Sequence, residues 1–190
     1  MMPQRIFNKA IRVLLVTNAL ILLAGAMLGP IYALFVENIG GDLMDASIAG
    51  ALFALAAGIV TLASGRLSDQ VRHSDQIIVF GYLMMATGFF LLQFIGSVYQ
   101  LFAIQMLIGI GEAIYSPAFD KLYSDHLTPT KSGTEWGAWE SMYYFTTAFG
   151  AFLGGLVVTN FGFSVLFAAM AMLCALSGGY LYRLSPRRVL

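Results

Sequence analysis

Six long apolar stretches, separated by short clusters of charged or turn-forming residues, constrain this sequence more than any other feature. They cover residues 11–36, 46–64, 76–95, 99–119, 136–159 and 163–182. Each is about long enough for a helix that crosses a bilayer, which needs roughly 20 apolar residues. The apolar runs are continuous, whereas a transmembrane β-barrel needs short segments of alternating apolar and polar residues. We therefore expect an all-α membrane protein with six transmembrane helices.

Composition excludes a soluble domain. Of the 190 residues, 59% are hydrophobic and 11% are charged, against about 45–50% apolar and about 25% charged in ordinary globular proteins. The formal net charge is zero, so nothing favours a nucleic-acid partner. Cys174 is the single cysteine and can form no internal disulfide. No linker or low-complexity tract divides the chain, and residues 1–190 are interpreted as one six-helix transmembrane domain in the lipid bilayer.

The basic residues are confined to alternate connections, which predicts the orientation. They precede the first stretch, follow the second, fourth and sixth stretches, and are absent from the remaining three connections: Arg5, Lys9, Arg12, Arg66, Arg72, Lys121, Lys131, Arg183, Arg187 and Arg188. Lys and Arg are retained on the cytoplasmic side during insertion. We expect both termini in the cytoplasm and the protein in the plasma (inner) membrane.

The connection after the second stretch carries the most specific pattern. Its residues 65–73 read GRLSDQVRH. They resemble the signature loop of the major facilitator superfamily, G-x-L-x-D-r-x-G-r-r, at the same place between helices two and three. Gly65 and Asp69 match, whereas Arg72 occupies the usual second Gly. In that family the loop latches two halves of a transporter, which implies gating roles for Gly65, Arg66, Asp69 and Arg72. The alternative is a charged turn of the kind that any polytopic protein needs.

Glycine spacing extends the resemblance to the fourth and fifth stretches. Gln105, Gly109, Gly111 and Pro117 follow a second family motif, with Gln105 in place of its usual Arg. Gly150, Gly154 and Gly155 are similar to the fifth-helix motif of drug/proton antiporters, with Ala151 at its characteristic Pro. Such spacing is also general helix packing in membranes, so we expect Gly109, Gly150, Gly154 and Gly155 at helix contacts.

The resemblance implies half of a familiar fold. Family members usually have twelve helices in two halves, each built from two inverted three-helix repeats around a midplane site, and six helices correspond to one half. A lone half would expose its polar cavity face to lipid, which is costly. We therefore expect a homodimer with a twofold axis along the membrane normal. Asp69 should then approach residues 133–139 of the second copy.

Two acids, Glu112 and Glu140, fall inside the apolar stretches and are the leading candidates for a transport site. Gln105, Gly109, Glu112 and Ser116 repeat at helical spacing on one stripe of the fourth stretch. Charge within the bilayer costs about 2.5–3.5 kcal/mol on insertion scales. Glu112 could equally be a neutral, hydrogen-bonded core acid. Glu140 could be an ordinary acid in the first turns of a helix.

Two further polar residues complete the candidate cavity. Asn18, inside the first stretch, faces either the cavity or a neighbouring helix. Tyr144 continues the stripe that Glu140 begins. With Tyr115 and Tyr143, Tyr144 suggests an aromatic lining that suits a hydrophobic or amphipathic small molecule.

The leading hypothesis is a secondary transporter that acts as a homodimer by alternating access. One alternative is a non-transporting membrane subunit, or a half-transporter that pairs with a separate six-helix chain. An intramembrane enzyme is disfavoured because no paired nucleophile and base lie in the apolar stretches. No P-loop, metal-ligand spacing or cofactor motif is present, so we expect no catalytic residues, no metal and no cofactor. No motif identifies the substrate, the direction of transport or an ion coupling.

Overall fold

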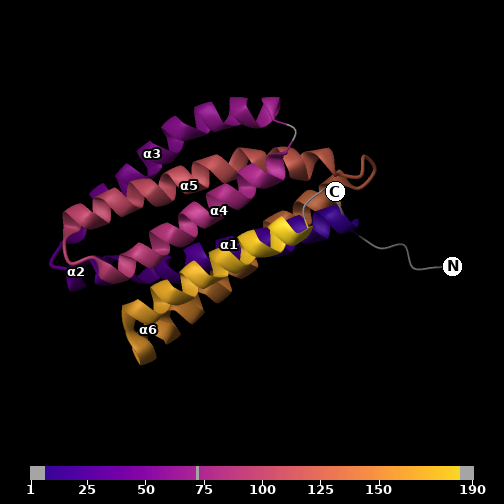
Figure 1. Cartoon of the computed structure of the whole chain (residues 1–190). Coiled ribbons are helices and arrows are strands. Elements are labelled where there is room, and N and C mark those ends of the chain that lie inside the picture. The colour runs from indigo at the N-terminus through magenta and orange to yellow at the C-terminus, as the bar shows by residue number, and fades with distance from the viewer. Residues whose placement is uncertain (1–6, 72, 185–190) are drawn as a thin grey trace.

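The computed structural model describes residues 7–71 and 73–184, which form helices and contain no strand (Figure 1). The elements, in chain order, are α1 (Lys9–Leu28), the 3₁₀-helix η1 (Gly29–Ile31), α2 (Tyr32–Asn38), α3 (Leu43–Gln70), α4 (Ser74–Leu91), the 3₁₀-helix η2 (Leu92–Phe94), α5 (Val98–Asp125) and α6 (Ser132–Leu184). Five helical segments in this described part are long and apolar enough to cross a membrane.

The first apolar stretch is interrupted rather than continuous. Asn8 caps α1, where its Oδ1 accepts a hydrogen bond from the Ile11 amide at 2.8 Å. The helix tightens into η1 at Gly29 and resumes as α2 at Tyr32. Pro30 lacks the amide hydrogen that a regular α-helix needs at this position. The sequence predicts one helix over 11–36, whereas the structure has a 3₁₀ turn at residues 29–31 between two α-helical segments.

Helix α3 is longer at both ends than the predicted stretch 46–64. At its start, Asp42 and Asp45 form a capping box, each side chain accepting a hydrogen bond from the other's amide at 2.9–3.0 Å. At its end, residues 65–70 remain helical although they were expected in a loop. Charged residues can extend a helix beyond its apolar part when they point outwards, and Arg66 and Asp69 are both exposed.

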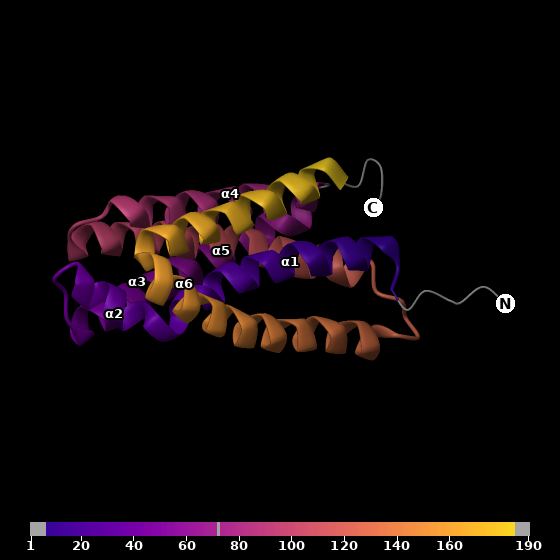
Figure 2. The same ribbon diagram turned by 90° about the horizontal axis from the view of Figure 1, so that it is seen from below.

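Helix α6 contains a reversal at Gly162. A straight helix of its 53 residues would be about 80 Å long at about 1.5 Å per residue. Gly162 has φ 81° and ψ 174°, a conformation that glycine adopts at little cost. The arms before and after it run along the bundle in opposite directions (Figure 2). The non-helical residue falls within the predicted connection 160–162.

The helices pack in a fixed set of pairs. Helix α1 lies against α6, α3 against α5, and α4 against both α5 and α6. The core contains large, fully buried side chains that are at most 1% exposed, among them Tyr82, Tyr123, Phe119 and Phe167. Helix α3 contributes little to this core, since only 6% of its most apolar stretch is buried, against 39% in α4 and in α5.

Two crossings depend on glycine. A Cβ atom at Gly109 of α5 would collide with the carbonyl oxygen of Phe53 in α3. Likewise, a Cβ at Gly154 of α6 would collide with the carbonyl oxygen of Met27 in α1, and one at Gly150 would lie 2.6 Å from the Ala26 Cβ. Backbones therefore approach closely at both crossings.

One end of the bundle collects the described basic residues. The start of α1, the ends of α3, α5 and α6, and the starts of α4 and α6 lie at this end (Figure 1). The six basic residues of these segments are Lys9, Arg12, Arg66, Lys121, Lys131 and Arg183. Arg5, Arg72, Arg187 and Arg188 lie outside the described residues. The described basic residues, which occur in every second connection of the sequence, thus lie together at one end of the bundle.

Candidate functional site

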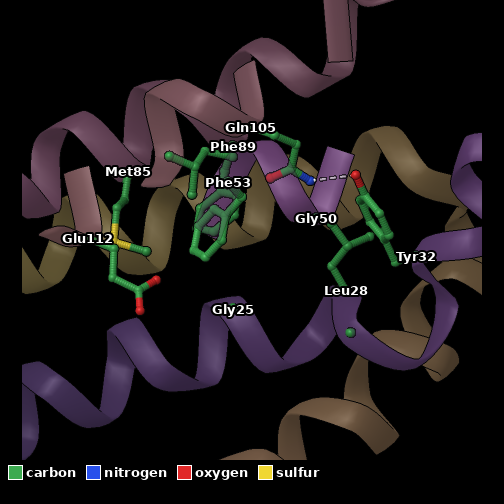
Figure 3. A pocket seen from close by; sticks show the side chains of 11 residues that line it. Gly25, Leu28, Tyr32, Gly50, Phe53, Met85, Phe89, Gln105 and Glu112 are labelled. Atoms are coloured by element: carbon green, nitrogen blue, oxygen red, sulfur yellow. Dashed lines mark hydrogen bonds between the residues drawn. The ribbon is translucent and has the colours of Figure 1, made fainter. Parts of the chain in front are cut away.

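A cavity of about 370 Å³ opens between α1, α3, α4 and α5 (Figure 3). Its 11 lining residues are mostly apolar or glycine and include no basic residue: Gly25, Leu28, Gly29, Tyr32, Gly50, Phe53, Met85, Phe89, Gln105, Ile108 and Glu112. The α3–α5 crossing borders it, since Phe53, which contacts Gly109 through its backbone, is one of these residues. Close packing on one side of the helix pair therefore leaves a hollow on the other.

One end of the cavity is formed by a side-chain hydrogen bond. Gln105 Nε2 donates to the Tyr32 hydroxyl at 2.7 Å. The two residues lie 73 positions apart in the sequence. Tyr32 is the first residue of α2, directly after η1, and Gln105 lies in the first half of α5. Gln105 is 9% exposed, so this pair keeps polar groups satisfied inside an apolar wall.

Glu112 forms the opposite end. It follows Gln105 by seven residues on α5, which separates the two by about 10 Å along the helix. Its carboxylate points across the cavity towards α1 (Figure 3). No hydrogen bond or ion pair joins it to another residue of the described chain. An unpaired carboxylate among apolar helices is a free acceptor for a ligand.

Between the two polar ends the cavity wall is apolar and partly made by missing side chains. Phe53 and Phe89 lie between Gln105 and Glu112 (Figure 3), and Met85 lines the cavity as well. At Gly25 and Gly50 no heavy atom lies within 4 Å of where a Cβ would be. These two glycines are therefore not required by helix packing within the chain, and they leave space for a ligand.

The predicted stripe on α5 divides in two. Gln105 and Glu112 line the cavity, whereas Gly109 between them contacts α3. Ser116 is half-buried and is not one of the lining residues. On α6, Gly150 and Gly154 contact α1, while nothing lies within 4 Å of a Cβ at Gly155.

The remaining candidates lie away from this cavity. Asn18 is 2% exposed and its Oδ1 is buried without a partner among the described residues. Glu140 and Tyr144 are exposed on the first arm of α6, which contributes no lining residue. Of the six predicted cavity residues, Gln105 and Glu112 line this cavity. Tyr32 lines it too, and the sequence did not indicate Tyr32 as a hydrogen-bond partner of Gln105.

The motif residues on α3 lie at the exposed end of the helix. Arg66 and Asp69 are exposed, and nothing lies within 4 Å of a Cβ at Gly65. A side chain at Gly65 would therefore meet no neighbouring helix among the described residues. Arg72 lies outside the described residues. The described motif residues with charged side chains, Arg66 and Asp69, are therefore exposed at this end of α3.

The contacts that hold this end of α3 come from residues that the sequence analysis passed over. Ser64 Oγ donates to the Ala113 carbonyl at 2.5 Å, and Lys121 Nζ donates to the Ser68 carbonyl at 2.7 Å. A cation is favoured at a helix C-terminus, where carbonyl groups lack partners. The available signal was the spacing of Ser64 and Ser68, which are four residues apart on one face.

A second overlooked residue is Glu135, which is 0% exposed. Its carboxylate accepts hydrogen bonds from the Thr128 amide at 2.7 Å and from the Thr128 hydroxyl at 3.1 Å. Tyr123 donates to its backbone carbonyl at 2.5 Å. Glu135 therefore orders the connection between α5 and α6, and its acid is satisfied within the chain.

The sequence matches a known protein family and is similar to two of the proteins described below. The family model described as Major Facilitator Superfamily matches residues 14–189. The chain is 24% identical over 184 residues to the multidrug resistance protein MdtG of Serratia proteamaculans, a match that covers 95% of this chain and 44% of that protein. It is 28% identical over 158 residues to the uncharacterized MFS-type transporter YitZ of Bacillus subtilis, covering 82% of this chain and 94% of that protein.

The fold is similar to a solved structure as well. The crystal structure of the POT family transporter PepTSo matches with a TM-score of 0.77 and 20% identity, over 99% of this chain and 39% of that chain. The chain thus spans less than half the length of MdtG and of PepTSo, and it matches most of YitZ.

Proposed function

The chain belongs to the major facilitator superfamily, whose members are integral membrane transporters and not enzymes, and on that premise we propose that it is a secondary transporter for small molecules. The observation that carries this proposal is the cavity, in which Gln105 and Glu112 interrupt an otherwise apolar wall. Its mostly apolar lining suits a hydrophobic or amphipathic substrate. Transport proceeds by alternating access of the cavity to the two sides of the membrane.

The proposed domain is a single unit of six membrane spans, with both arms of α6 crossing. The arms before and after Gly162 are about 45 Å and about 33 Å long at about 1.5 Å per residue. Each can cross a hydrocarbon core of about 30 Å. The arrangement corresponds to two inverted three-helix repeats. The end of the bundle that carries the basic residues faces the cytoplasm, and the membrane is the plasma (inner) membrane.

The transporter works as a homodimer in this proposal. Exposed side chains on the first arm of α6 include Glu140, Tyr144 and Thr147, and an exposed carboxylate in hydrocarbon is costly. Helix α3 also leaves most of its surface uncovered. A second copy, related by a twofold axis along the membrane normal, would cover both helices. Asp69 at the exposed end of α3 would then meet residues 133–139 of the other protomer.

Disulfide crosslinking in membranes tests the dimer. Two differently tagged chains, one carrying Asp69→Cys and the other Thr134→Cys, are expressed together in a Cys174→Ala background, which removes the native thiol. We expect a covalent dimer that contains both tags. The control pair combines Asp42→Cys with Thr134→Cys, because Asp42 lies at the other end of α3, and it should form no dimer.

Capture of the pair only within one chain, in a double variant, would remove the homodimer from the proposal. The same result together with capture by a different six-helix chain would favour a half-transporter with a separate partner.

Flux through reconstituted vesicles tests transport itself. Three fluorescent solutes cover the charge classes: ethidium as a cation, carboxyfluorescein as an anion and methylumbelliferyl glucoside as a neutral amphipath. We expect that at least one is carried, and that Glu112→Gln lowers its flux at least about tenfold because the carboxylate lines the path. If no solute of any class crosses faster than in empty vesicles, a non-transporting membrane subunit becomes the better description.

A further inference from the structure

The arrangement of polar groups in the cavity narrows the chemistry of its ligand. The wall carries one acid, Glu112, and none of its lining residues is basic. Because the Glu112 carboxylate has no partner among the described residues, a ligand must either leave it unpaired or bring a cation. In a site surrounded by apolar helices, the attraction between opposite charges is stronger than in water. A cationic group at this end therefore fits the site better than a neutral or anionic one.

Aromatic rings reinforce the preference for a cation. Phe53 and Phe89 line the cavity, and the faces of such rings attract organic cations. Met85 also lines the cavity, and its sulfur is soft and polarisable. No lining side chain offers a positive charge to an anion.

The opposite end of the cavity, at Gln105 and Tyr32, favours a different chemical group of the ligand. Gln105 donates one hydrogen bond to Tyr32, which leaves the Gln105 carbonyl as an acceptor and the Tyr32 hydroxyl hydrogen as a donor. Neither group carries a charge. This end can therefore accept from and donate to a neutral hydroxyl or amide of the ligand.

The distance between the two ends sets the ligand's length. Glu112 and Gln105 are about 10 Å apart along α5, and the wall between them is apolar. Gly25 and Gly50 face open space, so the ligand's body can lie against the backbone at these positions. We propose that the cavity binds an elongated organic cation, with its ammonium group at Glu112, its apolar body along Phe53, Gly25 and Gly50, and a neutral hydrogen-bonding group at Gln105 and Tyr32. This proposal rests on the transport function proposed above.

Binding of three matched probes to the purified protein in detergent micelles tests each part by titration calorimetry. The first probe, para-(aminobutyl)phenol, carries an ammonium group and a hydroxyl at the two ends of an apolar body. Phenylbutylamine lacks the hydroxyl, and para-hydroxyphenylbutyrate carries a carboxylate in place of the ammonium group. We expect the first probe to bind, the second to bind about fivefold more weakly, and the third to bind at least about 100-fold more weakly.

Variants assign the binding to this cavity. Glu112→Gln should weaken the amine at least about tenfold, and Tyr32→Phe should remove the advantage of the hydroxyl probe. Gly50→Leu should abolish binding by filling the space. Its matched control is Gly58→Leu on the same helix, because Gly58 also faces open space but does not line the cavity. Thermal unfolding of each variant verifies that it is folded.

Three results would overturn the inference: tighter binding of the carboxylate probe, amine binding that Glu112→Gln leaves unchanged, or equal losses from Gly50→Leu and Gly58→Leu. Absence of binding by all three probes would also overturn it. If the flux experiment still shows Glu112-dependent transport of the neutral or anionic dye, the proposed transport function stands and only the inference of a cationic ligand fails. Amine binding with no flux of any solute would instead contradict the transport function alone.

Discussion

The two glycine crossings use the same packing device, yet they border different spaces. At the α3–α5 crossing, Gly109 lies between Gln105 and Glu112, and the adjacent cavity has polar ends. At the α1–α6 crossing, Gly150 and Gly154 contact α1 beside a groove of about 520 Å³. That groove has no charged residue in its lining: Leu23, Ala138, Ser141, Met142, Phe145, Thr146, Phe149 and Leu153.

This difference separates packing from function. Glycine spacing brings two helices together at both places, and it has the same effect on backbone distance. Only the first crossing has a polar side chain one turn before and another one turn after its glycine. The residues that flank a glycine motif, and not the glycine itself, therefore distinguish a candidate ligand site from a helix contact.

The largest expected effect is at the α1–α6 crossing. Gly154→Leu would drive a side chain into the Met27 backbone, which cannot rotate away as a side chain would. We expect a loss of about 3 kcal/mol in the free energy of unfolding, measured by thermal or denaturant unfolding in micelles. Gly155→Leu is the control, because nothing lies within 4 Å of its Cβ, and it should not lower the stability, since leucine gains up to about 1 kcal/mol of helix propensity over glycine. Similar losses in both variants would contradict the assignment of Gly154 to the contact.

Gly109→Ala tests the close approach of the backbones at the α3–α5 crossing. Alanine gains up to about 1 kcal/mol of helix propensity over glycine, but its Cβ would collide with the Phe53 carbonyl. We expect the collision to win, with a net loss of about 2 kcal/mol in unfolding free energy. Because Phe53 also lines the cavity, ligand binding or flux should fall as well.

The matched variant Gly150→Ala also introduces a close contact, with Ala26. It should lower stability without changing ligand affinity. A loss of affinity in Gly150→Ala as large as in Gly109→Ala would show that the two crossings are not functionally distinct.

The smallest expected effects concern one interhelical hydrogen bond in each of the two helix pairs, α3–α5 and α1–α6. Ser64 Oγ donates to the Ala113 carbonyl between α3 and α5, and Ser177 Oγ donates to the Thr17 carbonyl at 2.7 Å between α1 and α6. Ser64→Ala and Ser177→Ala should each cost about 0.6 kcal/mol of unfolding free energy, the usual value for such bonds in membrane proteins. The control is Ser47→Ala, whose hydroxyl bonds only within its own helix. A cost above about 2 kcal/mol in either variant would indicate a wider polar network.

The helical class could be predicted from the sequence, and so could the position of Gln105 and Glu112 on one face of α5, because both depend on local periodicity. The charged connections likewise predicted that the basic residues share one end of the bundle. The hydrogen bond between Gln105 and Tyr32 was not predictable in this way, because it joins residues 73 positions apart that no local periodicity relates. Apolar content alone also ends α3 too early, since exposed Arg66 and Asp69 continue the helix beyond its hydrophobic part.

The choice between two interpretations of a polar residue needed the structure as well. Asn18 could face the cavity or a neighbouring helix; it is buried and is not one of the residues that line this cavity. Glu135 attracted no attention because an acid near a helix start is common. Its complete burial follows from the connection to Thr128 and Tyr123, which no periodicity reveals.

The pairing of the first helix with the last has a consequence for synthesis. Thr17 and Ser177 are 160 residues apart, and at about 5–20 residues per second the ribosome needs roughly 8–30 s to make the second after the first. Helix α1 must therefore wait in the bilayer for its main partner, and it is the most hydropathic of the five candidate spans. Helix α5, the least hydropathic, carries Gln105 and Glu112 and emerges only after α3 and α4, against which it packs, have been made. The order of translation thus lets the polar helix enter a membrane where its neighbours are already present.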